Sequence, residues 1–228
     1  MENDQRFRDR FEAGRFLGEE LRQRGYGAGA DVLVLALPRG GVPVGYEVAR
    51  ALHAPLDVFI VRKVGVPGHE ELGMGAIASG GVKVVNEDVL DMLRIPRAMF
   101  EVVASKELQE VERREREYRG ERSRPDVKGK TVILVDDGLA TGSTMLAAVR
   151  AVALAGAERI VVAVPVAAEE TCDAFRHEVD DVICAITPQP FHAVGIWYEN
   201  FEQTSDDEVR ELLARAAEEL SHASAEAK

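Results

Sequence analysis

The chain has 228 residues, of which 28 are Lys or Arg and 40 are Asp or Glu, so its formal net charge is −12. Hydrophobic residues make up 46% and charged residues 30%, a balance typical of a folded globular protein. The acidic charge argues against nucleic acid as a partner, because neutralising phosphates takes clustered Lys and Arg, but it leaves open an anionic ligand held locally.

Short apolar runs alternate with amphipathic segments along the chain. The runs are rich in β-branched residues and apolar on both faces, as are strands buried between two helical layers. These predicted strands cover 32–37, 56–61, 131–136, 160–166 and 182–186. Helical spacing covers 42–52, 143–155 and 169–177. The alternation predicts an α/β fold with a mainly parallel twisted sheet flanked by helices, in a single domain over 1–228 with its core at about 30–187.

Three segments fall outside this alternation. The glycine-rich stretch 62–87 is expected to be a long loop with a hairpin at Gly80–Gly81. The stretch 97–122 has helical spacing and Glu–Arg pairs four residues apart, which predicts one long helix. Its acidic and basic residues nearly balance, so a solvated face is favoured over an RNA-binding one. The last segment is expected to end in a helix capped by Ser205, frayed after Ser221.

No apolar run reaches the roughly 18 residues that a membrane-spanning helix requires. The amino-terminal stretch is charged and lacks the apolar centre of a secretory signal. Cys172 and Cys184 are the only cysteines, too few for a disulfide framework or a zinc ribbon. We expect both to be reduced structural thiols, and the protein to be cytoplasmic with no membrane partner.

Two adjacent carboxylates, Asp136 and Asp137, end a buried strand and are followed by a loop of small residues that enters a helix. A helix amino terminus offers unpaired backbone N–H groups and the positive end of a dipole, so this loop can wrap a phosphate. The carboxylates would repel that phosphate, and we expect them to face the hydroxyls of a sugar. The predicted phosphate ligands are Thr141, Gly142, Ser143 and Thr144.

A second loop, with the sequence LPRGG over 37–41, also joins a buried strand to a helix. Arg39 and the backbone amides of Gly40 and Gly41 form a second candidate anion site. Two such loops favour a ligand that carries phosphates at both ends. The other aspartate pair, Asp180–Asp181, precedes its strand, so we expect a solvated turn at the opposite edge of the sheet.

These motifs carry a family resemblance. The stretch 132–144 has four apolar residues, two acidic ones, three small or apolar ones and Thr-Gly-x-Thr, and it resembles the phosphoribosyl pyrophosphate motif of type I phosphoribosyltransferases. LPRGG resembles the pyrophosphate loop of that family, and the order of motifs agrees over about 32–186. The stretches 61–68 (VRKVGVPG) and 135–145 are similar to those of adenine phosphoribosyltransferases.

The resemblance implies transfer of the 5-phosphoribosyl group from phosphoribosyl pyrophosphate to a nitrogen of a nucleobase-like acceptor, a purine slightly favoured, with release of pyrophosphate. Mg²⁺ is the implied cofactor, held mainly by ligand oxygens, with Asp136 or Asp137 as alternative protein ligands. The resemblance assigns catalysis to Asp136, Asp137, Arg39 and Lys63, the 5′-phosphate to Ala140, Thr141, Gly142, Ser143 and Thr144, and pyrophosphate to Arg39, Gly40, Gly41 and Lys63.

The resemblance also implies a mobile loop over about 65–81 and a small hood lobe with its helix over about 187–220. In the hood, Phe191 and Trp197 are candidates for stacking on a base, with packing as the commoner role of such aromatic residues. Ala140 stands where 6-oxopurine enzymes carry an aspartate, which argues against hypoxanthine or guanine. Glu70 or Glu71 is a candidate proton donor or acceptor, with a solvent-exposed loop carboxylate as the alternative role.

The alternative function is a non-catalytic regulatory protein that senses phosphoribosyl pyrophosphate. Some relatives have that role together with a nucleic-acid surface, which the balanced charges of 97–122 do not provide. A dinucleotide-binding oxidoreductase is excluded, because no G-x-G-x-x-G follows the first predicted strand. Whether the protein forms a homodimer is left open.

Overall fold

The computed structural model describes residues 6–27 and 31–226. Two expectations fall partly outside the described residues: the charged amino-terminal stretch, of which 1–5 are not described, and the start of the core at about residue 30. Within the described ranges, no helix is long and apolar enough to cross a membrane.

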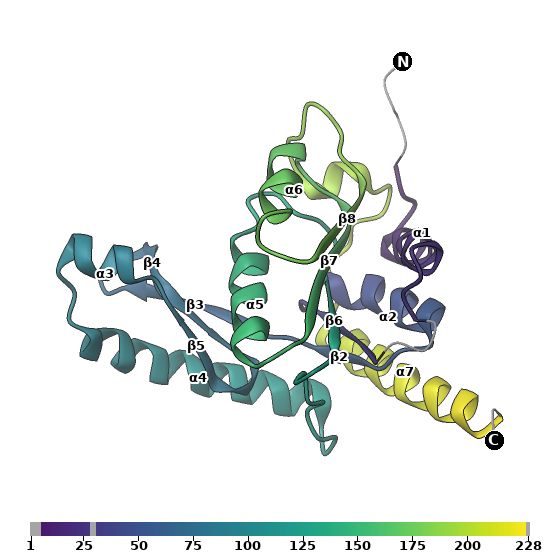
Figure 1. Ribbon diagram of the computed structural model, residues 1–228, viewed down its shortest axis with the longest axis horizontal. Coiled ribbons are helices and arrows are strands. Elements are labelled where there is room, and N and C mark those ends of the chain that lie inside the picture. Colours follow the sequence, from purple (N-terminus) through teal and green to yellow (C-terminus); the bar gives the residue numbers. More distant parts are fainter. Residues whose placement is uncertain (1–5, 28–30, 227–228) are drawn as a thin grey trace.

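A five-stranded parallel sheet forms the centre of the body (Figure 1). All four neighbouring strand pairs run parallel. In spatial order the strands are β2 (Leu56–Val58), β1 (Val32–Ala36), β6 (Thr131–Val135), β7 (Arg159–Val166) and β8 (Asp181–Ile186). Each coincides with one of the five apolar runs, so the predicted α/β class with a parallel sheet is confirmed.

Two helical layers cover the faces of this sheet, and they explain why its strands are apolar on both sides. Successive side chains of a strand point to opposite faces. Ile133 therefore packs in a cluster with α1 and α2, whereas its neighbour Leu134 packs in a cluster with α5 and α6. Both side chains are fully buried. The helices are α1 (Arg10–Gln23), α2 (Gly41–Leu52), α5 (Ser143–Leu154) and α6 (Glu169–Phe175).

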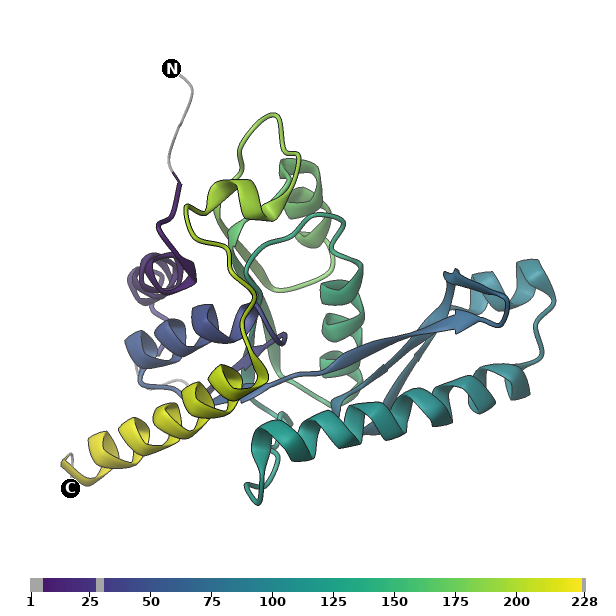
Figure 2. The same ribbon diagram turned by 180° about the vertical axis from the view of Figure 1, so that it is seen from behind.

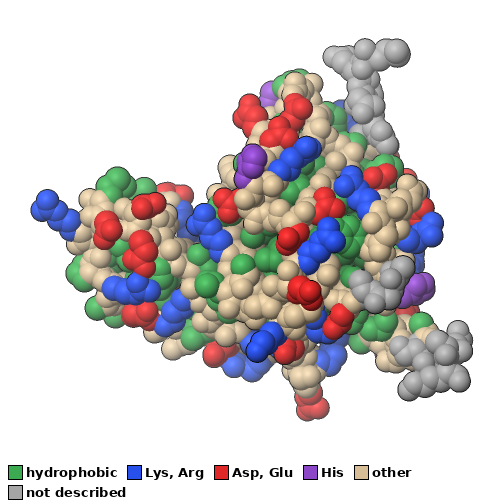
Figure 3. Space-filling model, viewed as in Figure 1, with side chains coloured by type: hydrophobic (Ala, Val, Ile, Leu, Met, Phe, Trp, Pro, Cys, Tyr) green, Lys and Arg blue, Asp and Glu red, His purple; other side chains and the backbone are tan. Residues whose placement is uncertain are grey.

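The chain from 61 to 119 forms an arm that projects from the body (Figures 1 and 2). It holds the antiparallel strands β3 (Val61–Val66), β4 (His69–Ala78) and β5 (Val82–Val85), then α3 (Glu87–Leu93) and α4 (Arg97–Arg119). Acidic and basic side chains are interspersed over the face shown in Figure 3.

The expected long loop over 62–87 is wrong, because this segment is mostly β-structure. Met74 and Ile77 of β4 are fully buried and pack in one cluster with Phe100 of α4, which gives the glycine-rich strands a hydrophobic support that lies outside the segment itself. The hairpin expected at Gly80–Gly81 is confirmed between β4 and β5. Closure of 65–81 over a ligand stays a prediction.

The long helix predicted over 97–122 is confirmed as α4, but its charged face is not solvated throughout. The side chains of Glu115 and Arg119 are only 6% and 7% exposed. Arg119 Nε donates to Asp57 Oδ2 at 2.8 Å, and Arg124 pairs with Glu115 at 3.0 Å. Buried charges are stable only when each has a partner, and this network provides one for each.

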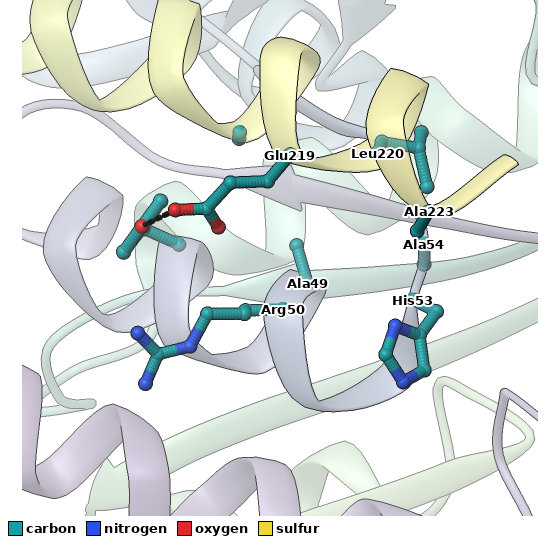
Figure 4. Close-up of a pocket in the computed structure, with 9 residues that line it drawn as sticks. Ala49, Arg50, His53, Ala54, Glu219, Leu220 and Ala223 are labelled. Atoms are coloured by element: carbon teal, nitrogen blue, oxygen red, sulfur yellow. Dashed lines mark hydrogen bonds between the residues drawn. The ribbon is translucent and has the colours of Figure 1, made fainter. Parts of the chain in front are cut away.

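The last helix, α7 (Asp206–Glu226), starts at the predicted cap, since Ser205 Oγ accepts the backbone N–H of Glu208 at 3.1 Å. It continues beyond Ser221, where fraying was expected. Against α2 it leaves a small pocket of about 40 Å³, beside which the hydroxyl of Tyr46 donates to Glu219 at 2.7 Å (Figure 4). The candidate site residues do not line this pocket.

A disulfide joins Cys172 in α6 to Cys184 in β8. The expectation of two reduced thiols is therefore wrong. Packing of α6 on the sheet brings the two Cα atoms within 6.6 Å, a separation that a disulfide spans. The expectation rested on each cysteine standing alone in an apolar stretch, which does not show that the two stretches are neighbours.

Candidate active site at the carboxyl edge of the sheet

The loops after β1 and β6 contact each other at the carboxyl edge of the sheet. A Cβ atom added at Gly40 would overlap Oδ2 of Asp137. One added at Gly41 would lie 2.8 Å from the carbonyl oxygen of Val135 and 3.1 Å from Oδ1 of Asp136. Only glycine permits so close an approach. The structure therefore brings together the LPRGG loop and the aspartate pair, which the sequence places about a hundred residues apart.

The two carboxyl groups differ in their surroundings. Oδ1 of Asp136 accepts the backbone N–H of Asp137 at 2.8 Å. Burial, with the charge of Asp137 beside it, raises the pKa of Asp136 well above its ordinary value. Burial also raises the pKa of Asp137, against the opposing effect of the Arg10 guanidinium. Carboxyl groups whose pKa is shifted by burial and by a specific charge cluster at functional sites.

Two residues far away in the chain hold Asp137. Arg10 Nη2 and Nε lie 2.8 Å and 2.9 Å from its Oδ2, and the hydroxyl of Tyr198 donates to its carbonyl oxygen at 2.6 Å. Arg10 was not predicted from the sequence. A signal was present, because Arg10 shares the buried face of α1 with Ala13 and Leu17. An arginine on the apolar face of a helix indicates a paired buried charge.

The predicted phosphate loop precedes α5 as expected. Gly142 has φ +70°, and a Cβ atom there would lie 2.5 Å from the ring of Phe175. The side chains of Thr141, Ser143 and Thr144 are exposed. Thr171 Oγ1 donates to the carbonyl oxygen of Ala140 at 2.6 Å, so α6 supports the loop from behind. The exposed hydroxyls and the first amides of α5 are thus available to an anion.

The two predicted cations lie in different surroundings. Arg39 follows a cis peptide bond after Pro38, and its Nη1 lies 3.7 Å from Oδ2 of Asp206, the first residue of α7. Lys63 lies on β3, and its ammonium group donates to the carbonyl oxygen of Glu71 in the arm. Arg39 therefore lies in the loop that contacts the aspartate pair, whereas Lys63 lies on the arm.

A cavity of about 380 Å³ separates the arm from α5. Its lining includes Lys63, Ser143, Thr144 and Arg150, and no Asp or Glu. Arg39 is not part of this lining. The structure thus groups Lys63 with the start of the phosphate helix in a space suited to an anionic ligand, and it does not group Lys63 with Arg39.

The hood aromatic residues take part in packing. Phe191 and Trp197 are half-buried against a cluster that contains Phe7, Val166 and Tyr198. The backbone carbonyl of Trp197 accepts the N–H of Phe7 at 2.9 Å, so this segment is tied to the amino-terminal part of the chain. Stacking of Phe191 or Trp197 on a base stays a prediction.

The second aspartate pair lies at the opposite edge, as expected, but it is more than a solvated turn, because Asp181 is half-buried and begins β8. Oδ2 of Asp180 accepts the N–H of Ile160 at 2.8 Å, and Oδ2 of Asp181 accepts the hydroxyl of Tyr26 at 2.8 Å. The first bond joins the amino ends of β7 and β8, and the second joins the start of β8 to the turn after α1. The two aspartate pairs therefore have different roles because they stand at opposite ends of parallel strands.

Comparisons with known proteins identify the family of this chain. The family model described as "Phosphoribosyl transferase domain" matches residues 8–200. Two Mycobacterium tuberculosis proteins, from strains CDC 1551 and H37Rv and each named "Putative phosphoribosyl transferase" (MT0597 and Rv0571c), are 45% identical over 219 residues. The alignment covers 96% of this chain and 49% of each relative, so the chain spans about half the length of the curated relatives it matches.

A crystal structure of the protein TT1426 from Thermus thermophilus has the same fold, with a TM-score of 0.83 and 40% sequence identity. The match covers 92% of this chain and 98% of that one. The family match includes both loops and the aspartate pair, and it confirms the family that the motifs of 37–41 and 132–144 predicted. The chain belongs to the phosphoribosyl transferase family.

Proposed function

We propose that this chain transfers the 5-phosphoribosyl group from phosphoribosyl pyrophosphate to a nitrogen of a nucleobase-like acceptor and releases pyrophosphate. The observation that carries the proposal is the contact of the 37–41 loop with Asp136 and Asp137, directly beside the phosphate loop before α5. Two anion-binding loops on either side of a carboxylate pair match a sugar that carries phosphate groups at two positions.

In this function each part of the site has one task. The amides and hydroxyls of 141–144 bind the 5′-phosphate, and the aspartate pair accepts hydrogen bonds from the ribose hydroxyls. Arg39, with the amides of Gly40 and Gly41, binds the departing pyrophosphate, and Lys63 adds a second cation from the arm. The ribose acquires oxocarbenium-like positive charge as the bond to pyrophosphate breaks, and nearby carboxylates stabilise that charge.

The residues at this edge fit a Mg²⁺ ion that is held mainly by its ligand. In the described part of the chain, no group of three or more His, Cys, Asp or Glu is placed to bind a metal ion without further ligands. Asp136 or Asp137 would supply a carboxylate oxygen, and phosphate and ribose oxygens would supply the rest. When bound, Mg²⁺ neutralises charge on pyrophosphate as it leaves.

A purine acceptor is favoured by the likeness of 61–68 and 135–145 to adenine phosphoribosyltransferases. Ala140 in the phosphate loop argues against a 6-oxopurine acceptor, because 6-oxopurine enzymes carry an aspartate at this position. A sensor without catalytic activity is the second candidate function, and it needs only the ligand site. Arg39 and Lys63 favour catalysis over sensing, because cations that meet the pyrophosphate stabilise its departure.

Thermal denaturation with phosphoribosyl pyrophosphate and Mg²⁺ tests the ligand site. At about 100 times the dissociation constant, binding adds about 2.7 kcal/mol to the free energy of unfolding. We expect the ligand to raise the melting temperature of the wild type and to leave that of the Asp136→Asn/Asp137→Asn double variant unchanged. A shift of equal size in both proteins would contradict the site. Release of pyrophosphate with a panel of bases then separates transferase from sensor, since a sensor binds the ligand while every base stays inert.

A further inference from the structure

Arg10, which was not predicted from the sequence, makes several contacts at the candidate site. Its side chain is 10% exposed, its Nε donates to Oδ2 of Asp137 at 2.9 Å, and its Nη2 forms an ion pair with the same oxygen at 2.8 Å. Its Nη1 donates to the carbonyl oxygen of Glu202 at 2.7 Å, and its guanidinium carbon lies 3.9 Å from the ring centroid of Phe201. The Nε/Nη2 edge, Nη1 and one face of the guanidinium thus each have a partner.

These contacts bring the segment before α1 and the hood segment together at the aspartate pair. The segment before α1 pairs with the hood, where the N–H of Glu199 donates to the carbonyl oxygen of Phe7 at 2.8 Å. The ring of Tyr198 lies 5.9 Å from that of Phe7. Its hydroxyl fixes the backbone of Asp137, while Arg10 fixes the side chain. A carboxylate held at both its backbone and one oxygen has little freedom to rotate.

Arg10 engages only one of the two carboxylate oxygens. Among the described residues, no other side chain donates a hydrogen bond to this carboxylate, which also interacts with its own backbone N–H, and the side chain is 17% exposed. The ion pair with Arg10 also places a positive charge beside this partly buried carboxylate, which favours its ionised form. A carboxylate fixed through Oδ2 presents Oδ1 as an oriented acceptor for a sugar hydroxyl.

We propose that Arg10 is the positioning residue of this site: it holds Oδ2 of Asp137 so that Oδ1 faces the ribose hydroxyls of phosphoribosyl pyrophosphate. The inference rests on the proposed function for its ligand. It goes beyond that function in giving the amino-terminal helix a part in ligand binding. Arg10 itself does not contact the ligand in this scheme. Its effect on affinity passes entirely through Asp137.

A double-mutant cycle on Arg10→Met and Asp137→Asn tests the proposal by calorimetric titration with phosphoribosyl pyrophosphate and Mg²⁺. We expect each single variant to weaken binding by about tenfold to a hundredfold, as for hydrogen bonds to a charged group. The double variant should bind about as weakly as either single variant, because both changes remove one interaction. Arg10→Lys, which restores the charge but not the planar two-nitrogen contact with Oδ2, should recover part of the affinity.

Arg15→Met is the matched control, because Arg15 is also on α1 and also pairs with a carboxylate, Glu47, at 3.1 Å. It should bind the ligand as tightly as the wild type. Losses that multiply in the double variant, or an Arg10→Met protein with unchanged affinity, would overturn the proposal. If Arg10→Met does not fold, Arg10→Lys and Asp137→Asn form the cycle.

The same cycle in ligand-free protein, measured by urea unfolding, separates this inference from the proposed function. Coupling between Arg10→Met and Asp137→Asn is expected there too. No coupling overturns the role of Arg10, whatever the ligand is. A wild-type protein that shows this coupling but does not bind phosphoribosyl pyrophosphate would instead overturn the proposed function, and the ribose contact with it.

Discussion

Nη1 of Arg39 lies 3.7 Å from Oδ2 of Asp206, so the cation of the proposed pyrophosphate loop faces a carboxylate at the start of α7. This distance is too long for a hydrogen bond, and both side chains are partly exposed, so the pair contributes at most about 1 kcal/mol. The hydroxyl of Tyr118 donates to Oδ1 of the same carboxylate at 2.5 Å and holds it in place. Asp206 therefore opposes an anion at Arg39 without orienting the guanidinium.

Replacement of Asp206 by Asn should consequently tighten the binding of phosphoribosyl pyrophosphate, by about two- to fivefold given the strength of an exposed ion pair. Calorimetric titration measures the change, which should shrink as salt is added. Asp207→Asn is the control, because Asp207 is 88% exposed and pairs with Arg210 within α7. Weaker binding by the Asp206→Asn protein would show that Asp206 orients Arg39.

The close contact of the two loops predicts the effect of Gly40→Ala. The added methyl group would overlap Oδ2 of Asp137, so the loop or the carboxylate must move. We expect the free energy of unfolding to fall by about 1–3 kcal/mol, the usual effect of overpacking, and ligand binding to be lost. Urea unfolding provides the measurement. In an Asp137→Ala background the same change should cost less, and an equal cost in both backgrounds would rule out this contact as the cause.

The two anion loops could be predicted from the sequence because their information is local. A strand, a short loop with glycine and a helix start are consecutive in the chain, as at 132–144, and a parallel sheet brings all such loops to one edge. The contact of Gly40 with Asp137 then follows from the adjacency of β1 and β6, which no local pattern specifies.

The partners of this site could not be predicted in the same way. Arg10 and Asp137 are 127 residues apart, and Tyr198 is 61 residues from Asp137. Such pairs depend on where the hood and α1 pack. The strands of the arm were missed for a related reason: their burial comes from α4, and their own composition is that of a loop. Composition and spacing describe an element, but not the surface that will cover it.

The disulfide between Cys172 and Cys184 predicts a dependence of stability on reducing agents. The cysteines are 12 residues apart, and cross-linking a loop of that size restricts the unfolded chain by about 3 kcal/mol. Dithiothreitol should lower the free energy of unfolding by about that amount. The Cys172→Ala/Cys184→Ala protein should be insensitive to it. Two titratable thiols in the denatured, unreduced wild type would contradict the disulfide.

The buried position of Asp136 leads us to expect that removing the charge of its carboxylate stabilises the folded protein. Burial, followed by the charge of Asp137, raises its pKa well above the ordinary value. An acid whose pKa is raised in the folded state contributes stability below its unfolded pKa of about 3.9, and that contribution is lost as pH rises through the folded pKa.

The side chain of the Asp136→Asn variant cannot ionise, and its amide oxygen can still accept the N–H of Asp137. At pH 7 the variant should therefore have a higher free energy of unfolding than the wild type. This gain should be absent near pH 4 and should grow by about 1.4 kcal/mol per pH unit until the pH reaches the folded pKa. Asp180→Asn is the control: its carboxylate accepts the N–H of Ile160 at the opposite edge, so it should not gain stability. Urea unfolding at several pH values measures both, and a pH-independent difference would refute the assignment.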